Sequence, residues 1–183
     1  MKDPYFFGYG SLVNRATHTY PDVHPVKIKG WHRHWRQTTV FHRAILTAVP
    51  DAESQISGLL ARVPDDDWTA LDEREHAYDR VDISDTASPL MDLCAQVAIY
   101  EIPNGKHPEP AVLHPIALSY LDVVVQGYLN EFGETGVADF FASTSGWEAP
   151  ILNDRHAPLY PRAQVLNTAE TQLVDRYISR LTT

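Results

Sequence analysis

The stretch YFFGYGSL at Tyr5–Leu12 has the pattern of a short aromatic strand that runs directly into a glycine turn. Gly8 and Gly10 let the backbone turn sharply and approach a ligand closely, because no side chain shields the amides. Successive N–H groups in such a turn form a small anion-binding nest. Taken alone, the stretch is more simply a strand that ends in a Gly-Ser turn, so its interpretation depends on residues further along the chain.

The length and composition favour one globular domain. A chain of 183 residues with 44% hydrophobic residues can bury a substantial core, and it is short for two domains. We expect a single domain over residues 1–183, in which residues 103–183 supply flanking helices and a long loop.

The charge balance bears on the class of ligand. Twenty-four acidic and 15 basic residues give a net charge of −9, which argues against a nucleic-acid partner. No run of about 18 apolar residues occurs, so we expect no membrane span. Cys94 is the only cysteine, which excludes an internal disulfide, and it is more simply a core residue than a nucleophile. The start, MKDP, lacks the apolar core of a signal peptide, and we expect a cytoplasmic protein that acts on a small molecule.

Alternating and β-branched segments predict about six strands. They fall at residues 5–8, 30–36, 38–49, 55–63, 78–85 and 96–102. Their short connections favour an α+β fold with a small, closed or nearly closed mixed β-barrel flanked by helices. In the second of these strands, Trp31, Arg33 and Trp35 would share one face.

Start signals, stop signals and apolar periodicity predict the helices. These are expected at residues 65–76, 116–132 with an end at Gly133, about 136–142, and 168–181 with an N-terminal cap formed by Asn167 and Glu170. The longest irregular stretch covers residues 143–163, a length typical of functional loops.

Glu75 is the first candidate for chemistry. At about 100° per residue, Trp68, Leu71 and Glu75 share one helix face. A carboxyl group among apolar side chains has a raised pKa, which suits it to accept a proton near neutral pH. The alternative is a helix-flank carboxylate that pairs with Arg74 or Arg80, and the spacing leaves both interpretations open.

Other site types are poorly supported. Ser11 lies in a segment similar to a nucleophile elbow, but that motif requires glycine at position 13, where Val13 stands. His32, His34 and His42 belong to no zinc-binding motif, and no Gly-Lys-Ser/Thr follows the glycines as in a P-loop. We therefore predict neither a metal nor a cofactor.

Two separated motifs resemble the γ-glutamylcyclotransferase superfamily, which includes the ChaC-type and γ-glutamylamine cyclotransferases. The first is Tyr-Gly-Ser-Leu at 9–12, and the second is LDERE at 71–75 followed by Tyr78-x-Arg80-Val81. The resemblance extends from residue 5 to about 102 and includes the Gly30–Arg36 segment. Further along, the spacing of Tyr120, Val123 and Gly127 is similar to a helix of the amine-type enzymes.

The resemblance implies a reaction and the residues that perform it. The α-amine of a γ-glutamyl substrate attacks its own γ-carbonyl, so that 5-oxoproline forms and the attached amine leaves without an enzyme nucleophile. Glu75 would be the general acid and base. The residues implied to bind the substrate are Tyr9, Gly10, Ser11, Leu12 and Tyr120.

One departure from the family pattern limits the substrate prediction. ChaC-type enzymes have Gly-Gly-Tyr after the catalytic glutamate, whereas this chain has His76-Ala77-Tyr78. The predicted substrate class is therefore a γ-glutamyl amide or peptide, with the leaving amine unspecified. The alternative functions are a small-molecule binding module that retains the fold without turnover, and acyl transfer through Ser11.

Overall fold

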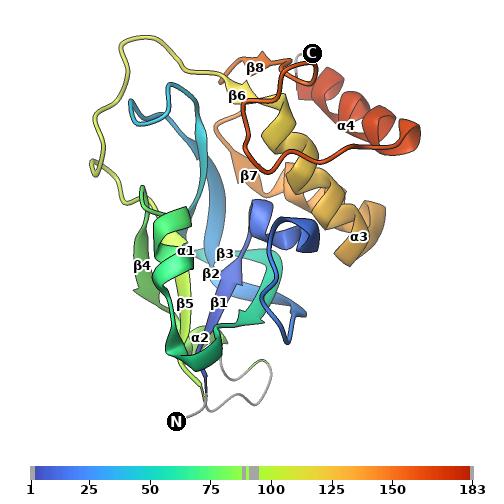
Figure 1. Ribbon diagram of the computed structural model, residues 1–183. Coiled ribbons are helices and arrows are strands. Elements are labelled where there is room, and N and C mark those ends of the chain that lie inside the picture. Colours follow the sequence, from blue (N-terminus) through green and yellow to red (C-terminus); the bar gives the residue numbers. More distant parts are fainter. Residues whose placement is uncertain (1–2, 88–89, 91–94, 182–183) are drawn as a thin grey trace.

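A six-stranded mixed sheet forms the centre of the computed structural model, which describes residues 3–87, 90 and 95–181 (Figure 1). The strands of this sheet are β1 (Tyr5–Gly8), β2 (His24–Arg36), β3 (Ile45–Arg62), β4 (Asp79–Asp82), β5 (Val97–Glu101) and β7 (Thr144–Ser145). They lie in the order β4-β5-β1-β3-β2-β7. A separate parallel pair is formed by β6 (Ile116–Ala117) and β8 (Ile151–Leu152).

Strand β1 lies inside the sheet, antiparallel to β3 and parallel to β5. Its side chains alternate between two hydrophobic clusters, with Tyr5 and Phe7 in one and Phe6 in the other. Because both of its faces are covered, β1 is apolar throughout, as expected from the aromatic run. The segment that follows it therefore leaves the sheet from a buried position.

The β2–β3 pair differs from the prediction. Residues 45–62 form one long strand instead of two strands joined by a turn, because residues 51–54 are accommodated as an irregularity opposite Gly30, where the register shifts. The strand predicted at 38–49 begins only at Ile45. Residues 37–44 form a loop instead, in which the Thr38 carbonyl contacts His114 Nδ1 at 2.8 Å and the Ala44 amide donates to Pro115.

The predicted α+β class with a mixed sheet flanked by helices is confirmed, but the sheet is not closed. Its outer strands, β4 and β7, do not pair with each other in the described part of the chain. A bridge between Ala48 of β3 and Glu101 of β5 curls the sheet toward a barrel.

Four α-helices flank the sheet in the described chain. They are α1 (Thr69–Arg74), α2 (Ser84–Ala87), α3 (Leu118–Ala142) and α4 (Thr168–Leu181). Three 3₁₀ turns accompany them: η1 (Ser11–Val13), η2 (Arg15–Thr17) and η3 (Pro64–Asp66). Helix α1 is shorter than the predicted 65–76, because Asp65 and Asp66 have positive φ and separate η3 from it.

Helix α3 carries the two helices predicted around Gly133. Gly133 has φ of +67° and divides α3 at the predicted end of its first part. Near its middle, α3 presses against the segment after η1: a Cβ on Gly127 would lie 2.7 Å from the amide nitrogen of Asn14. Asn14 Nδ2 in turn donates to the Val123 carbonyl at 3.0 Å.

Helix α4 packs beside α3, on one side of the sheet (Figure 1). Its predicted cap is confirmed, since Asn167 and Glu170 exchange side-chain to backbone hydrogen bonds of 2.7 and 3.0 Å. Among the described helices, none combines the length and the apolar character needed to cross a bilayer.

The predicted face of β2 is buried, and it includes a charged residue. Arg33 lies between Trp31 and Trp35 and is fully buried. Its guanidinium donates to the Ser57 carbonyl at 3.0 Å and to the Tyr128 hydroxyl at 2.8 Å. This arginine therefore joins β2 to β3 and to α3 by hydrogen bonds that satisfy its buried donors.

Candidate active site

A cavity of about 560 Å³ lies between α1, the start of α3 and two loops. Its lining draws on both halves of the chain: Ser11, Phe41, Arg43, Ala44, Ile45, Leu46, Ala70, Glu73, Arg74, Glu75, His76, Ala77, Tyr78, Ala117, Tyr120, Tyr160, Pro161 and Arg162. A recess of about 30 Å³ adjoins it and is bounded by residues 7–12. Ser11, Glu75 and Tyr120 line both spaces, so they stand where the recess meets the cavity.

The glycine turn after β1 forms the wall of the recess. The Val13 amide donates to the Gly10 carbonyl at 3.0 Å, which closes η1. The first N–H groups of a helical turn have no acceptor within it, so the amides of Ser11 and Leu12 point out of the turn, and that of Ser11 contacts the Tyr120 hydroxyl. A Cβ on Gly10 would stand 2.7 Å from the Tyr120 hydroxyl, so this close approach requires glycine.

Glu75 follows the last residue of α1, and its amide still donates to the Leu71 carbonyl at 2.9 Å. Its side chain is only 14% exposed. Burial raises the pKa of the Glu75 carboxyl above its usual value, while the charges of Arg74 and Arg162 oppose that rise. Both interpretations left open by the sequence therefore apply, because the carboxylate is largely buried and is also paired with Arg74.

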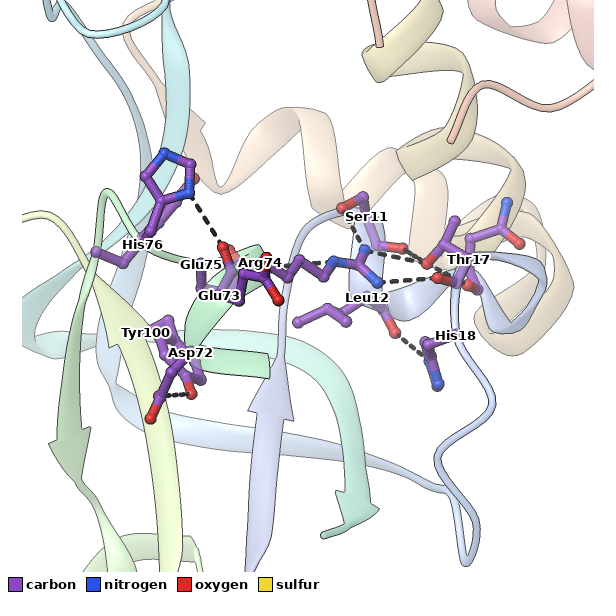
Figure 2. A network of polar contacts seen from close by, with 12 residues as sticks. Ser11, Leu12, Thr17, His18, Asp72, Glu73, Arg74, Glu75, His76 and Tyr100 are labelled. Carbon is purple, nitrogen blue, oxygen red and sulfur yellow. Dashed lines mark hydrogen bonds and ion pairs between the residues drawn. The ribbon is translucent and has the colours of Figure 1, made fainter. Parts of the chain in front are cut away.

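Arg74 connects Glu75 to the glycine turn (Figure 2). Its Nε lies 3.2 Å from Glu75 Oε1, and its Nη2 donates to Ser11 Oγ at 3.2 Å. Its Nη1 donates to the Thr17 carbonyl at 2.9 Å, and the side chain is only 7% exposed. The sequence interpretation treated Arg74 only as a possible partner of Glu75. Its place next to the acid in LDERE was a signal that the spacing argument did not use.

Tyr120 lies in the first turn of α3, with its ring edge-on to Trp35 and to Tyr160. Burial raises the pKa of Tyr120 well above its usual value, and a backbone hydrogen bond from Ser11 partly opposes this effect. The hydroxyl is therefore neutral at ordinary pH and faces the glycine turn.

The four residues of the first motif have different positions. The Tyr9 hydroxyl donates to the Tyr100 carbonyl at 2.5 Å, away from the cavity, and the Tyr9 carbonyl accepts from Tyr128 at 2.8 Å. Leu12 packs with Phe6 in the smaller hydrophobic cluster. All four residues line the recess. The side chains of Tyr9 and Leu12 also anchor the turn by these contacts, and of the four, Ser11 lines the larger cavity as well.

The structure also locates the other candidates. His32 and His34 lie on the outer face of β2, both near Ser145 Oγ. Within residues 3–87, 90 and 95–181, no group of three or more His, Cys, Asp or Glu side chains is arranged to hold a metal ion. Cys94 lies outside the described residues.

The sequence matches the family model of ChaC-like proteins over residues 4–119, which include both motifs. The chain belongs to the ChaC-like protein family. A search of the curated proteins finds no match.

Solved structures show that this ChaC-like chain shares the fold of γ-glutamyl cyclotransferases. It superimposes on a γ-glutamyl cyclotransferase with a TM-score of 0.55 at 13% identity, covering 96% of this chain and 99% of the other. YkqA from Bacillus subtilis gives a TM-score of 0.55 at 18% identity, covering 80% of this chain and only 57% of YkqA. The resemblance to the superfamily is confirmed at the level of the ChaC-like family and of the fold.

Proposed function

We propose that this enzyme cleaves a γ-glutamyl amide or peptide by intramolecular cyclisation. The α-amine of the substrate attacks the γ-carbonyl, a five-membered ring closes, and the bond to the attached nitrogen breaks. The products are 5-oxoproline and the free amine or amino acid. A solved structure with the same fold is named a γ-glutamyl cyclotransferase, and this supports the reaction class.

The observation that carries the proposal is that Glu75 and the Gly10–Leu12 turn bound one small recess. The amides of the turn would bind the substrate's α-carboxylate, and this would hold the α-amine near Glu75. Fixing the folded-back conformation of the substrate converts a flexible chain into a near-attack geometry, which supplies a large part of the rate gain.

Glu75 would move the proton. Its carboxylate takes a proton from the substrate's α-ammonium group, so that the free amine can attack. The same carboxyl group then protonates the leaving nitrogen as the tetrahedral intermediate collapses, which returns Glu75 to its starting state. The second proton of the ring nitrogen passes to the departing amine, so that the lactam is neutral and the amine leaves as an ammonium ion. A shuttle of this kind contributes about 10²- to 10⁴-fold to the rate.

The oxyanion that develops on the γ-carbonyl needs a hydrogen-bond donor. Two groups that bound the recess would suit this role, namely a backbone N–H of the turn and the Tyr120 hydroxyl. The raised pKa of Tyr120 keeps its proton in place near neutral pH, so the hydroxyl remains a donor.

The contacts of Ser11 argue against acyl transfer. Ser11 Oγ accepts a hydrogen bond from Arg74, and an arginine cannot take the proton that a serine nucleophile must lose. The Ser11 hydroxyl is better suited to anchor the glycine turn to Arg74 through this hydrogen bond.

The test is a panel of γ-glutamyl amides and peptides, with 5-oxoproline measured as the product. We expect release from at least one compound, and Ser11→Ala should still turn it over, which acyl transfer through Ser11 does not allow. Binding of these compounds without any product would support the non-catalytic binding module instead. A covalent adduct on Ser11, detected by mass spectrometry, would favour acyl transfer.

A further inference from the structure

The outer part of the cavity brings together two arginines from distant parts of the sequence. Arg43 lies in the loop before β3, and Arg162 lies in the segment between β8 and α4. Arg43 Nη1 donates to the Leu159 carbonyl at 3.0 Å, so the two segments are joined directly. Both arginines therefore belong to one wall of the same space.

The segment that carries Arg162 is fixed to the start of α3. The carboxylate of Asp154 accepts from the Ser119 amide at 2.7 Å and from the Leu159 amide at 2.9 Å. Ser119 Oγ accepts in turn from the Tyr160 amide at 3.2 Å. Asp154 is buried, and these contacts hold the segment two residues before Arg162.

Some of the charged side chains that line the cavity form an ion pair, and others do not within the described part of the chain. Arg74 and Glu75 form an ion pair at its inner end. Among the described residues, neither Arg43 nor Arg162 has a carboxylate within ion-pair distance. Glu73 is the remaining acidic residue of the lining, and it is exposed on α1. The outer cavity thus presents half-buried Arg43 and exposed Arg162 against exposed Glu73. The charge of Arg162 also acts on Glu75, but from beyond ion-pair distance.

We propose that Arg43 and Arg162 bind a carboxylate on the leaving group, and therefore that the preferred substrate is a γ-glutamyl amino acid or peptide with a free carboxylate. This proposal rests on the proposed function. Guanidinium groups match carboxylates in charge and in hydrogen-bond geometry. The recess of about 30 Å³ suits the γ-glutamyl carboxylate, and the cavity of about 560 Å³ has room for the leaving amino acid.

Of the two arginines, only Arg43 lies in the part of the chain that matches the family model. Arg162 and the segment that holds it lie beyond residues 4–119, which match the ChaC-like family model. Selection of the leaving group would then combine one residue from the matched part, Arg43, with one residue from outside it.

A matched pair of substrates tests the proposal. γ-Glutamyl-alanine and γ-glutamyl-alaninamide differ only in that the second has a neutral amide in place of the terminal carboxylate. We expect kcat/KM for the acid to exceed that for the amide by about 10- to 100-fold, the range for one or two charge-assisted hydrogen bonds. Arg162→Gln and Arg43→Gln should each lower this ratio, chiefly through KM for the acid. Arg176→Gln, on the exposed face of α4, should leave it unchanged.

Binding to the Glu75→Gln variant separates this proposal from the proposed function. Isothermal titration calorimetry with both compounds measures recognition of the carboxylate whether or not the enzyme turns them over. Tighter binding of the acid, lost in the Glu75→Gln/Arg162→Gln double variant, is the expected result. Equal affinities would overturn carboxylate recognition even if 5-oxoproline forms. Tighter binding of the acid without product from the parent enzyme would instead contradict the cyclotransferase proposal.

Discussion

Arg74 Nε lies 3.2 Å from Glu75 Oε1, and both side chains are largely buried. The same guanidinium holds Ser11 Oγ and the Thr17 carbonyl. One arginine therefore sets the distance between the glycine turn and the candidate acid–base group. Its positive charge also lowers the pKa of that group. The predictions below follow from this arrangement and from the residues around it.

Replacing Glu75 with glutamine removes the proton shuttle but keeps the shape of the side chain. We expect 5-oxoproline release to fall by about 10²- to 10⁴-fold. The melting temperature should stay close to that of the parent protein, because the amide still accepts a hydrogen bond from Arg74. Full turnover in Glu75→Gln would show that another group moves the proton.

The pH dependence of kcat/KM should report the ionisation of Glu75. The base must be ionised to accept a proton, so activity is lost as the pH falls through its pKa. Burial raises that pKa, and the acid limb should therefore lie at a higher pH than for an ordinary carboxyl group.

The Arg74→Gln variant removes a positive charge that lowers the pKa of Glu75, so its acid limb should move further toward neutral pH. Arg80→Gln is the matched control, because Arg80 pairs with Asp72 at an exposed site. An unchanged pH profile in Arg74→Gln would contradict the assignment of Glu75 as the titrating base.

Gly10 should be intolerant of a side chain. A Cβ at this position would stand 2.7 Å from the Tyr120 hydroxyl, so Gly10→Ala must displace either the turn or the tyrosine. We expect KM for a γ-glutamyl substrate to rise by about tenfold or more, since a small displacement disrupts a positioned ligand.

The Gly10→Ala/Tyr120→Phe double variant removes the hydroxyl that the new methyl group meets. Its loss of kcat/KM should be smaller than the product of the two separate losses, which is the signature of residues in contact. Independent effects in this double-mutant cycle would mean that Gly10 does not approach Tyr120 in solution.

His18 should make stability dependent on pH. Burial lowers the pKa of His18 to about 4, although its contact with the Leu12 carbonyl opposes the shift. The unfolded chain binds a proton near pH 6.5, so stability should decline as the pH falls from about 6.5 toward 4. The contribution should be about 1–3 kcal/mol.

Urea unfolding of the parent protein and of His18→Gln across this pH range isolates the contribution of His18. The difference in unfolding free energy between the two proteins should change with pH. A difference that is constant from pH 7 to pH 4 would show that His18 is not held neutral.

Much of the fold was predictable, because many of its elements depend on residues that are close together in the sequence. The aromatic β1, the shared face of Trp31, Arg33 and Trp35 on β2, and the cap of α4 were predicted correctly, whereas the burial of Arg33 was not predicted. The turn expected at residues 51–54 was wrong, because pairing with β2 carries β3 through a locally polar segment. Pairing partners so distant in sequence leave no local signal.

The candidate site was predicted less completely, for a related reason. Glu75 and Ser11 carry recognisable motifs, and the structure places both at one recess. Arg74 was not recognised as their connection, because its contacts to Ser11 and Thr17 span about sixty residues of sequence. Arg43 and Arg162 are even further apart, and only the folded chain places them in one wall.

The contact between Gly127 and Asn14 links two properties that are usually measured separately. Gly127 and Tyr120 lie on the same helix, two turns apart, and both press against the segment that begins with the glycine turn. A larger side chain at position 127 would displace α3 from Asn14 and carry Tyr120 with it. Folding stability and substrate affinity are therefore coupled at position 127, so a substitution there should lower both.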